Sequence, residues 1–163
     1  MQRATPEGTD EKTNKDCLDT FREYYLAHMQ DMTAPYEGVI PLIEKLREKG
    51  IKTAVVSNKF HRAVYELCQD YFPGLIDEAI GVSIEAERKP SPVNVYKAME
   101  KLGVTAEECI YIGDSEVDVQ TARNAGVRCI GVTWGFRDEE QLRDAGCEII
   151  SDNCTDIFTF IVN

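Results

Sequence analysis

An alternation between short apolar runs and amphipathic stretches begins at Val39, and it constrains the fold more than any other feature of the sequence. Short apolar runs are typical of buried strands, and apolar residues repeated every three to four positions are typical of helices. We predict strands at residues 51–56, 79–82, 109–112, 128–132 and 148–150, and helices at 39–49, 62–71, 92–102, 116–125, 139–144 and 154–161, with Ser91 capping the helix that begins at Pro92. Strands this apolar, each followed by a helix, predict a parallel sheet covered on both faces. The fold class is therefore α/β, with a three-layer Rossmann-like arrangement.

The segment before this alternation has a different pattern. Between residues 10 and 32, apolar and aromatic side chains such as Phe21, Tyr25 and Met29 recur at helical spacing among charged residues. This pattern predicts one amphipathic helix. The turn-forming run Ala34-Pro35-Tyr36-Glu37-Gly38 ends it, so we divide the chain into residues 1–34 and 35–163.

Length and charge limit the function classes. The 163 residues suffice for a single sizeable core, and a net charge of -11 repels nucleic acid and anionic membrane surfaces. We therefore expect no nucleic-acid partner and no membrane partner. A small anionic ligand is still compatible with this charge, because one pocket needs only local positive charge and backbone N–H groups.

The cysteines and the N-terminal residues bear on location. The six cysteines form no C-x-x-C pair and lie apart from His28 and His61, so we expect reduced thiols in a core and not a zinc site. The first residues lack the apolar region of an export signal. A cytoplasmic location is the expectation.

Ligands of such sheets bind beyond the carboxyl ends of the strands, and candidate site residues follow two of the predicted strands. Ser57 and Asn58 come directly after residue 56, where a hydroxyl and free N–H groups could hold a phosphate oxygen; alternatively Ser57 only caps a helix. Asp114 and Asp118 follow the strand that ends at residue 112 and could hold Mg²⁺ through hard oxygen ligands; alternatively they cap the next helix and favour its positive end. Gly113 indicates a close approach of the backbone to a bound group.

A third candidate lies in a loop. Lys89 stands between the acidic residues Glu85 and Glu87 and the prolines Pro90 and Pro92, which stiffen the loop. Lys89 could thus be a point charge for a phosphate, although a lone loop lysine is usually solvated. Tyr111 and Cys109 lie in a predicted strand and are expected in the core.

Taken in order, Ser57-Asn58-Lys59, Lys89-Pro90, Gly113-Asp114-Ser115 and Asp118 resemble the motifs of the haloacid dehalogenase superfamily. Residues 35–39 and 131–135 are similar to the phosphoglycolate phosphatase branch, and the helix at 10–32 resembles the tail of that branch's early helical cap. The resemblance covers residues 35–163. It implies a haloacid dehalogenase-like core that follows the remnant of a cap.

The resemblance also implies roles for these residues in a Mg²⁺-dependent phosphomonoester hydrolase that acts on a small phosphorylated metabolite. Ser57 would hydrogen-bond the transferring phosphoryl group, the backbone at Asn58 would add N–H donors, and Lys89 would neutralise its charge. Asp114 would bind Mg²⁺, and Asp118 would support either the metal shell or Lys89. Such chemistry relies on positioning and electrostatic stabilisation.

The sequence departs from the family at the nucleophile. The family carries an Asp-x-Asp pair after its first strand, and no two aspartates stand two apart here. We therefore expect this chain to be the C-terminal part of a longer phosphatase, to lack the first, central strand, to be inactive as given, and to self-associate through the gap. Alternatives are a non-catalytic module that binds Mg²⁺ and phosphate, a parent enzyme acting as a pyrophosphatase or as a sugar-phosphate phosphatase or mutase, and a receiver-like domain phosphorylated on Asp114.

Overall fold

A computed structural model describes residues 4–163 of the chain, and it divides them into two units that meet at Ala34 and Pro35. The first unit contains α1 (Glu11–His28), which begins at Asp10, whose carboxylate accepts the Thr13 N–H. The helix is shorter than the predicted 10–32 because turns follow His28. None of its residues is buried.

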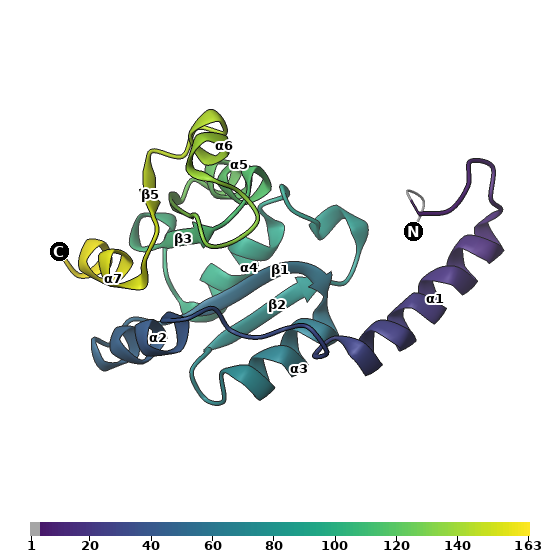
Figure 1. Ribbon diagram of the computed structural model, residues 1–163, viewed down its shortest axis with the longest axis horizontal. Helices are drawn as coiled ribbons and strands as arrows, with labels where there is room; N and C mark the ends of the chain where they lie inside the picture. The colour runs from purple at the N-terminus through teal and green to yellow at the C-terminus, as the bar shows by residue number, and fades with distance from the viewer. Residues whose placement is uncertain (1–3) are drawn as a thin grey trace. The chain divides into compact units, whose positions relative to one another are not determined.

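The second unit alternates helices and strands as predicted (Figure 1). Its elements are α2 (Val39–Glu48), β1 (Ala54–Phe60), α3 (His61–Tyr71), β2 (Glu78–Val82), α4 (Val93–Leu102), β3 (Ile110–Gly113), α5 (Glu116–Ala125), β4 (Arg128–Val132), α6 (Glu139–Asp144), β5 (Ile149–Ser151) and α7 (Cys154–Val162). Short 3-10 turns occur at Glu85–Glu87 and Ala106–Glu108. The α/β prediction is confirmed.

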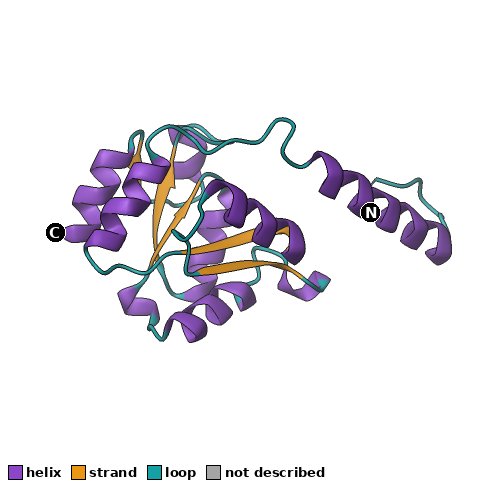
Figure 2. Cartoon of the chain, turned by 90° about the horizontal axis from the view of Figure 1, so that it is seen from below, coloured by secondary structure: helices purple, strands orange, loops and turns teal. Residues whose placement is uncertain are grey.

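The strands form two parallel groups (Figure 2). In one, β1 pairs with β2; in the other, the order is β3-β4-β5. Within residues 4–163, β1 and β3 each have a strand partner on one edge only. The first, central strand that the resemblance implies stays a prediction.

Helices cover both faces of β4, as the three-layer prediction requires. Ile130 and Val132 pack with Leu42 of α2 and Ile157 of α7. Cys129, the residue before Ile130, packs instead with the cluster that includes Val119 of α5. Alternate residues of the strand thus point to opposite helical layers, which leaves loops at the strand ends to carry a site.

The prediction for β1 is wrong at both ends. Residues 51–53 precede the strand, and Thr53 N–H binds the Asp77 carboxylate at 2.8 Å. The strand continues to Phe60 through a register shift after Val56, so Ser57 and Asn58 lie within an irregular part of the strand and not after it. The irregular backbone fits because Gly81 faces it: a Cβ at Gly81 would lie 2.6 Å from the Lys59 carbonyl oxygen.

The prediction that Ser91 caps α4 is also wrong. The cap position belongs to Pro92, and no side chain caps this helix. Ser91 instead continues the turn of the preceding loop, where its N–H binds the Arg88 carbonyl oxygen at 3.0 Å. The end of this loop is held by Asn124 of α5, whose amide donates to the Pro90 carbonyl oxygen at 2.8 Å.

Candidate active site

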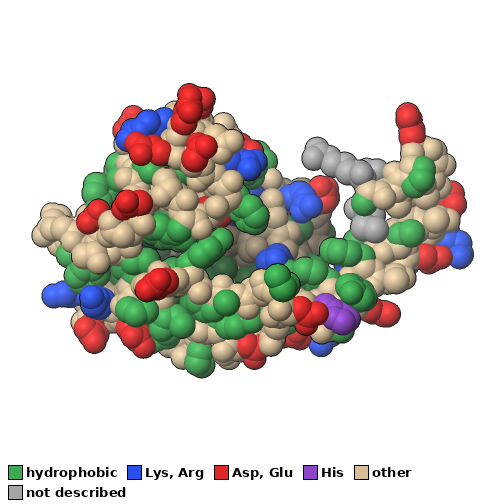
Figure 3. Space-filling view, viewed as in Figure 1, with side chains coloured by type: hydrophobic (Ala, Val, Ile, Leu, Met, Phe, Trp, Pro, Cys, Tyr) green, Lys and Arg blue, Asp and Glu red, His purple; other side chains and the backbone are tan. Residues whose placement is uncertain are grey.

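A cavity of about 230 Å³ opens at the carboxyl ends of β1, β3 and β4. Its wall includes Lys89, Asp114, Asp118 and the aromatic side chains of Tyr36, Tyr111 and Trp134, together with Val56, Ile112, Gly113 and Val132. The space-filling view shows a hollow in the molecule with hydrophobic side chains around it (Figure 3). Two of the three predicted sets of site residues therefore share one cavity.

Lys89 and Asp118 form an ion pair on the cavity wall. Lys89 Nζ lies 2.6 Å from Asp118 Oδ1, and the two side chains are only 15% and 7% exposed. The bond joins the loop before α4 to the first turn of α5. Lys89 is thus fixed at the cavity and is not the solvated loop lysine of the alternative interpretation.

Asp118 has further hydrogen-bond donors around it. Ser115 Oγ donates to Asp118 Oδ2 at 2.6 Å, and the Tyr111 hydroxyl donates to Oδ1 at 3.1 Å. Burial raises the pKa of Asp118, but the Lys89 charge and the hydrogen bonds from Lys89, Ser115 and Tyr111 outweigh it and lower the pKa below its ordinary value. Asp118 is therefore a carboxylate at neutral pH.

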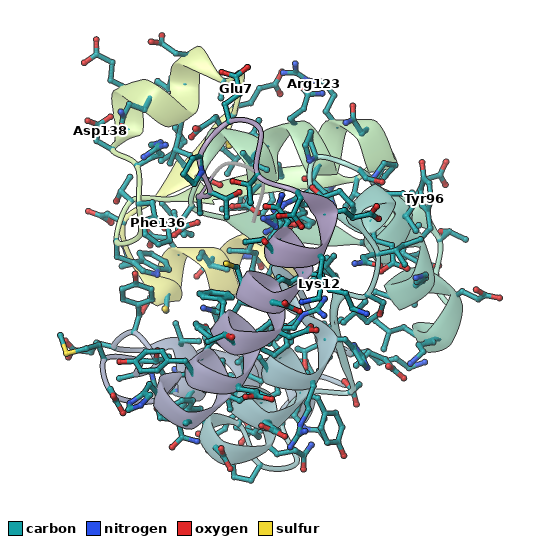
Figure 4. The ribbon with its side chains drawn as sticks, turned by 90° about the vertical axis from the view of Figure 1, so that its right-hand side faces the viewer. Glu7, Lys12, Tyr96, Arg123, Phe136 and Asp138 are labelled. Carbon is teal, nitrogen blue, oxygen red and sulfur yellow. The ribbon has the colours of Figure 1, made fainter. Side chains whose placement is uncertain are left out.

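Asp114 is half-buried on the same wall and is held by the loop after β4. Its Oδ2 accepts the Phe136 N–H at 3.1 Å, while the guanidinium of Arg137 pairs with Glu116 through two bonds of 2.7 and 2.9 Å. Phe136 lies in the segment between β4 and α6 and is 80% exposed (Figure 4). The loop thus contacts both Asp114 and the start of α5.

Two glycines make these approaches possible. A Cβ at Gly135 would overlap the Asp114 carboxylate, and a Cβ at Gly113 would overlap the Asp118 side chain. The close approach predicted at Gly113 exists, but it is an approach to Asp118. Alanine at either position would displace a carboxylate from the cavity wall.

Among the described residues, no Lys, Arg or His forms an ion pair with the Asp114 carboxylate, although the Arg137 charge acts on it from the loop after β4. Burial raises its pKa above the ordinary value, the Phe136 N–H opposes this rise, and the Asp118 charge adds to it. A cation beside Asp114 would remove this cost. The cavity therefore contains one group that favours a bound anion, Lys89, and one that favours a bound cation, Asp114.

Few side chains of the described residues are available as ligands for Mg²⁺ at this site. Residues 4–163 contain no group of three or more His, Cys, Asp or Glu side chains that could hold a metal ion. Mg²⁺ at phosphate-transfer sites is held by one or two carboxylates together with waters and substrate phosphate. Asp114, with lone pairs left beside its bond to Phe136, fits such an ion.

Ser57 and Asn58 are placed differently from the sequence expectation. Ser57 Oγ accepts the Lys59 N–H at 3.2 Å, so it makes a local turn, and Val56 is the residue of β1 on the cavity wall. The Asn58 side chain accepts the Lys89 backbone N–H at 2.7 Å. Asn58 therefore holds the Lys89 backbone through its side chain, a role that the sequence interpretation missed.

Tyr111 was expected in the core, and its ring does pack there, with Val95 and Ala125. Its hydroxyl, however, lies between Lys89 and Asp118. Burial, and then the Asp118 charge, raise the pKa of Tyr111. One sequence signal could have identified this role of Tyr111. The tyrosine stands three residues before the strand-end aspartate Asp114, at a strand position where Val or Ile would pack equally well.

Asp77, another carboxylate near a strand, lies before β2 at the amino end of that strand. It binds Thr53 N–H and, at 3.1 Å, Arg47. Its contacts are those of a structural residue.

The helices in the described part of the chain were also compared with membrane spans by their length and composition. None of them is both long enough and apolar enough to cross a bilayer.

The sequence of the chain is similar to those of known hydrolases. Residues 2–132 match the family described as haloacid dehalogenase-like hydrolase. Phosphoglycolate phosphatase of Aquifex aeolicus is 32% identical over 127 residues, which are 77% of this chain and 60% of that protein. Pyrophosphatase PpaX of Halalkalibacterium halodurans is 27% identical over 99% of this chain and 73% of its own.

A solved structure is similar over most of the chain. The crystal structure of a protein from Lactobacillus delbrueckii subsp. bulgaricus, assigned as a phosphoglycolate phosphatase, superposes with a TM-score of 0.86 at 40% identity, covering 96% of this chain and 65% of that one. The chain thus spans less than two thirds of this protein and of the Aquifex protein. By its sequence match and its fold, the chain belongs to the haloacid dehalogenase-like hydrolase family.

Proposed function

We propose that this chain supplies the phosphate-neutralising and metal-binding part of a Mg²⁺-dependent phosphomonoester hydrolase of the phosphoglycolate phosphatase kind. One observation carries the proposal: Lys89 and Asp114 line the same cavity, and Asp118 holds Lys89 there through an ion pair. Mg²⁺ would supply electrostatic stabilisation of a phosphoryl group. The relatives named phosphoglycolate phosphatase support this substrate class.

In this proposal each residue has a defined task. Lys89 would donate to a phosphoryl oxygen, Asp114 would hold the metal, and Asp118 would fix Lys89. Asn58 would hold the Lys89 backbone through its side chain, and Ser57, next to Val56, would donate to the phosphoryl group only if its local bond to Lys59 N–H opens. Catalysis of this type depends on such positioning.

The chain as given would bind its ligands without turning them over, because it contains no Asp-x-Asp pair. A non-catalytic module that binds Mg²⁺ and phosphate is therefore the second candidate, and the missing pair is the observation that favours it. For the parent enzyme, pyrophosphate is an alternative substrate, supported by the pyrophosphatase relative. A sugar phosphate is a further alternative.

The proposed partner is a small phosphorylated metabolite and not a nucleic acid. The net charge of -11 supports this, and so does Lys89, the one cation that the described residues place on the cavity wall. We also propose a cytoplasmic location, which the six free cysteines support.

The experiment compares two proteins. The first is the chain itself, assayed with Mg²⁺ for phosphate release from 2-phosphoglycolate, pyrophosphate, glucose 1-phosphate and an aryl phosphate. The second carries in addition the N-terminal segment of the Aquifex relative. We expect release only from the second, and its loss on Asp114→Asn. Release by the chain alone that survives Asp114→Asn would refute the proposal, and a second protein that is folded but inactive would favour the non-catalytic module.

A further inference from the structure

We propose that Tyr111 is a positioning residue that directs the Lys89 ammonium group, so that one N–H of Lys89 is left for one oxygen of a phosphate in the cavity. The inference rests on the proposed function, because it concerns how the same site holds a phosphate group. It assigns a role to a residue that sequence analysis expects only in the core.

The hydrogen-bond directions around Tyr111 are fixed by chemistry. An ammonium group only donates and a carboxylate only accepts. The Tyr111 hydroxyl must therefore accept from Lys89 Nζ, at 3.4 Å, and donate to Asp118 Oδ1, at 3.1 Å. The three groups close a small ring, since Lys89 also donates to Asp118 Oδ1 at 2.6 Å.

This ring accounts for two of the three Lys89 N–H bonds. One is donated to Asp118 and one to Tyr111, and Lys89 also lies on the cavity wall. The third N–H can then serve a ligand oxygen. Without the Tyr111 hydroxyl, the Lys89 ammonium group could rotate about its bond to Asp118, and two of its N–H bonds would have no fixed direction.

Tyr111 is suited to this task because its own position is rigid. Its ring packs against the buried cluster of Val95 on α4, Ala125 on α5 and Val127, the residue before β4. A lysine, in contrast, has a flexible stem with several rotatable bonds. The core therefore fixes the phenol, and the phenol limits the motion of Lys89 before any ligand arrives.

The test follows the Lys89 ammonium directly. In the full chain labelled with ¹⁵N-lysine, its ¹H–¹⁵N ammonium signal is identified by its loss in Lys89→Arg. We expect Tyr111→Phe to speed exchange of these protons with water on the order of tenfold, as the loss of one hydrogen bond to a charged group implies. An unchanged exchange rate in folded Tyr111→Phe would overturn the inference.

Tyr96→Phe is the matched control. Tyr96 projects from α4, and its hydroxyl donates to the Asn124 carbonyl oxygen at 3.1 Å (Figure 4). This variant also removes one tyrosine hydroxyl bond, to the backbone of the residue whose side chain holds Pro90, but it leaves the bonds of the Lys89 ammonium group intact. We expect no change in the Lys89 signal; an equal change in both variants would show a general effect of stability and overturn the inference.

Two further measurements keep the inference separable from the proposed function. In the unmutated chain, a nuclear Overhauser contact between the Lys89 ammonium and the Tyr111 ring is expected, and its absence overturns the inference even if Tyr111→Phe fails to fold. Titration with inorganic phosphate should then show binding about tenfold weaker in Tyr111→Phe than in Tyr96→Phe. If the unmutated chain binds no phosphate with or without Mg²⁺, the proposed function fails, and the phosphate part of the inference fails with it. The ammonium signal still decides whether Tyr111 directs Lys89.

Discussion

Lys89 Nζ and Asp118 Oδ1 lie 2.6 Å apart in a setting where both side chains are largely removed from water. Burial of two charges is costly, and their attraction offsets this cost only with good geometry and additional hydrogen bonds. Ser115 and Tyr111 provide those bonds on the carboxylate side. The pair therefore does not favour stability in itself, but it places a cation where a phosphate could reach it.

Removing one partner of this pair should strongly destabilise the chain. We expect Asp118→Ala to lower the free energy of unfolding by about 3–5 kcal/mol, because Lys89 is left as an unpaired buried charge. Asp16→Ala is the control, since Asp16 pairs with Lys12 at 3.0 Å on the surface and such a pair contributes roughly 0–1 kcal/mol. Urea unfolding measures both. Similar losses in the two variants would contradict the buried pair.

Asp114→Asn should stabilise the chain. The folded state raises the pKa of Asp114, so the ionised side chain lowers stability at any pH above the folded-state pKa. This loss shrinks as pH falls through the folded-state pKa and is gone below the ordinary value of 3.8. The Asn oxygen can still accept the Phe136 N–H. We expect a rise in Tm of roughly 2–4 °C at pH 7, the change that about 1 kcal/mol causes in a chain of this size. A Tm that falls would show that the charge of Asp114 is compensated.

Mg²⁺ should stabilise the folded chain through Asp114. An ion present at a hundred times its Kd would add about 2.7 kcal/mol to the free energy of unfolding. This gain should vanish in Asp114→Asn. Thermal unfolding with MgCl₂ measures this gain in stability. Na₂SO₄ and NaCl at the same concentration are the controls, and an equal gain from these salts would exclude a specific site.

The loop after β4 should affect the same ion. Arg137→Ala removes the bidentate contact with Glu116 that ties this loop to α5, so we expect Mg²⁺ to bind several-fold more weakly. Arg143→Ala is the matched control, because Arg143 pairs with Glu139 within α6 at 2.6 Å. Titration of Mg²⁺ followed by amide NMR compares them. If both variants bind Mg²⁺ as the unmutated chain does, the loop does not position Asp114.

Acid should unfold the chain through a small set of carboxylates. The hydrogen bond from Lys97 and those from the Ser83 and Ile84 backbone lower the pKa of Glu87 from 4.5 to about 2, and the hydrogen bond from Arg137 lowers that of Glu116 from 4.5 to about 2. Because these folded-state pKa values are depressed, their stabilisation is full above pH 4.5 and is lost as pH falls toward 2. Glu87→Gln and Glu116→Gln should flatten the fall of Tm in this window. Exposed Glu23→Gln is the control, and an unchanged slope in all three would contradict the assignment.

Sequence periodicity predicted most of the fold because it reports burial along single elements. The bounds of α5, β4 and α6 agree with prediction to the residue. The end of β1 was wrong because its irregular register depends on Gly81, a contact between residues far apart in sequence.

The candidate site shows the same division between local and distant information. Lys89, Asp114 and Asp118 could be brought together because the motifs that contain them occur in the order of the haloacid dehalogenase superfamily, which the sequence resembles. The use of the Asn58 side chain and the Tyr111 hydroxyl could not, because each depends on hydrogen bonds across the fold, of Asn58 to Lys89 and of Tyr111 to Lys89 and Asp118. Periodicity describes which face a residue occupies, and it carries no information on hydrogen-bond partners.

The two groups of strands lead to a last prediction, which is self-association. In the described part of the chain, β1 and β3 each present one edge without a strand partner, and Ile112 on β3 is 40% exposed. Unpaired backbone groups next to exposed apolar side chains favour pairing with another chain. We expect the sedimentation coefficient to rise with protein concentration. Ile112→Lys, which places a charge on the edge, should reduce this rise, whereas Val93→Lys at the start of α4 should not; a monomer at all concentrations would show that these edges are protected in the folded chain.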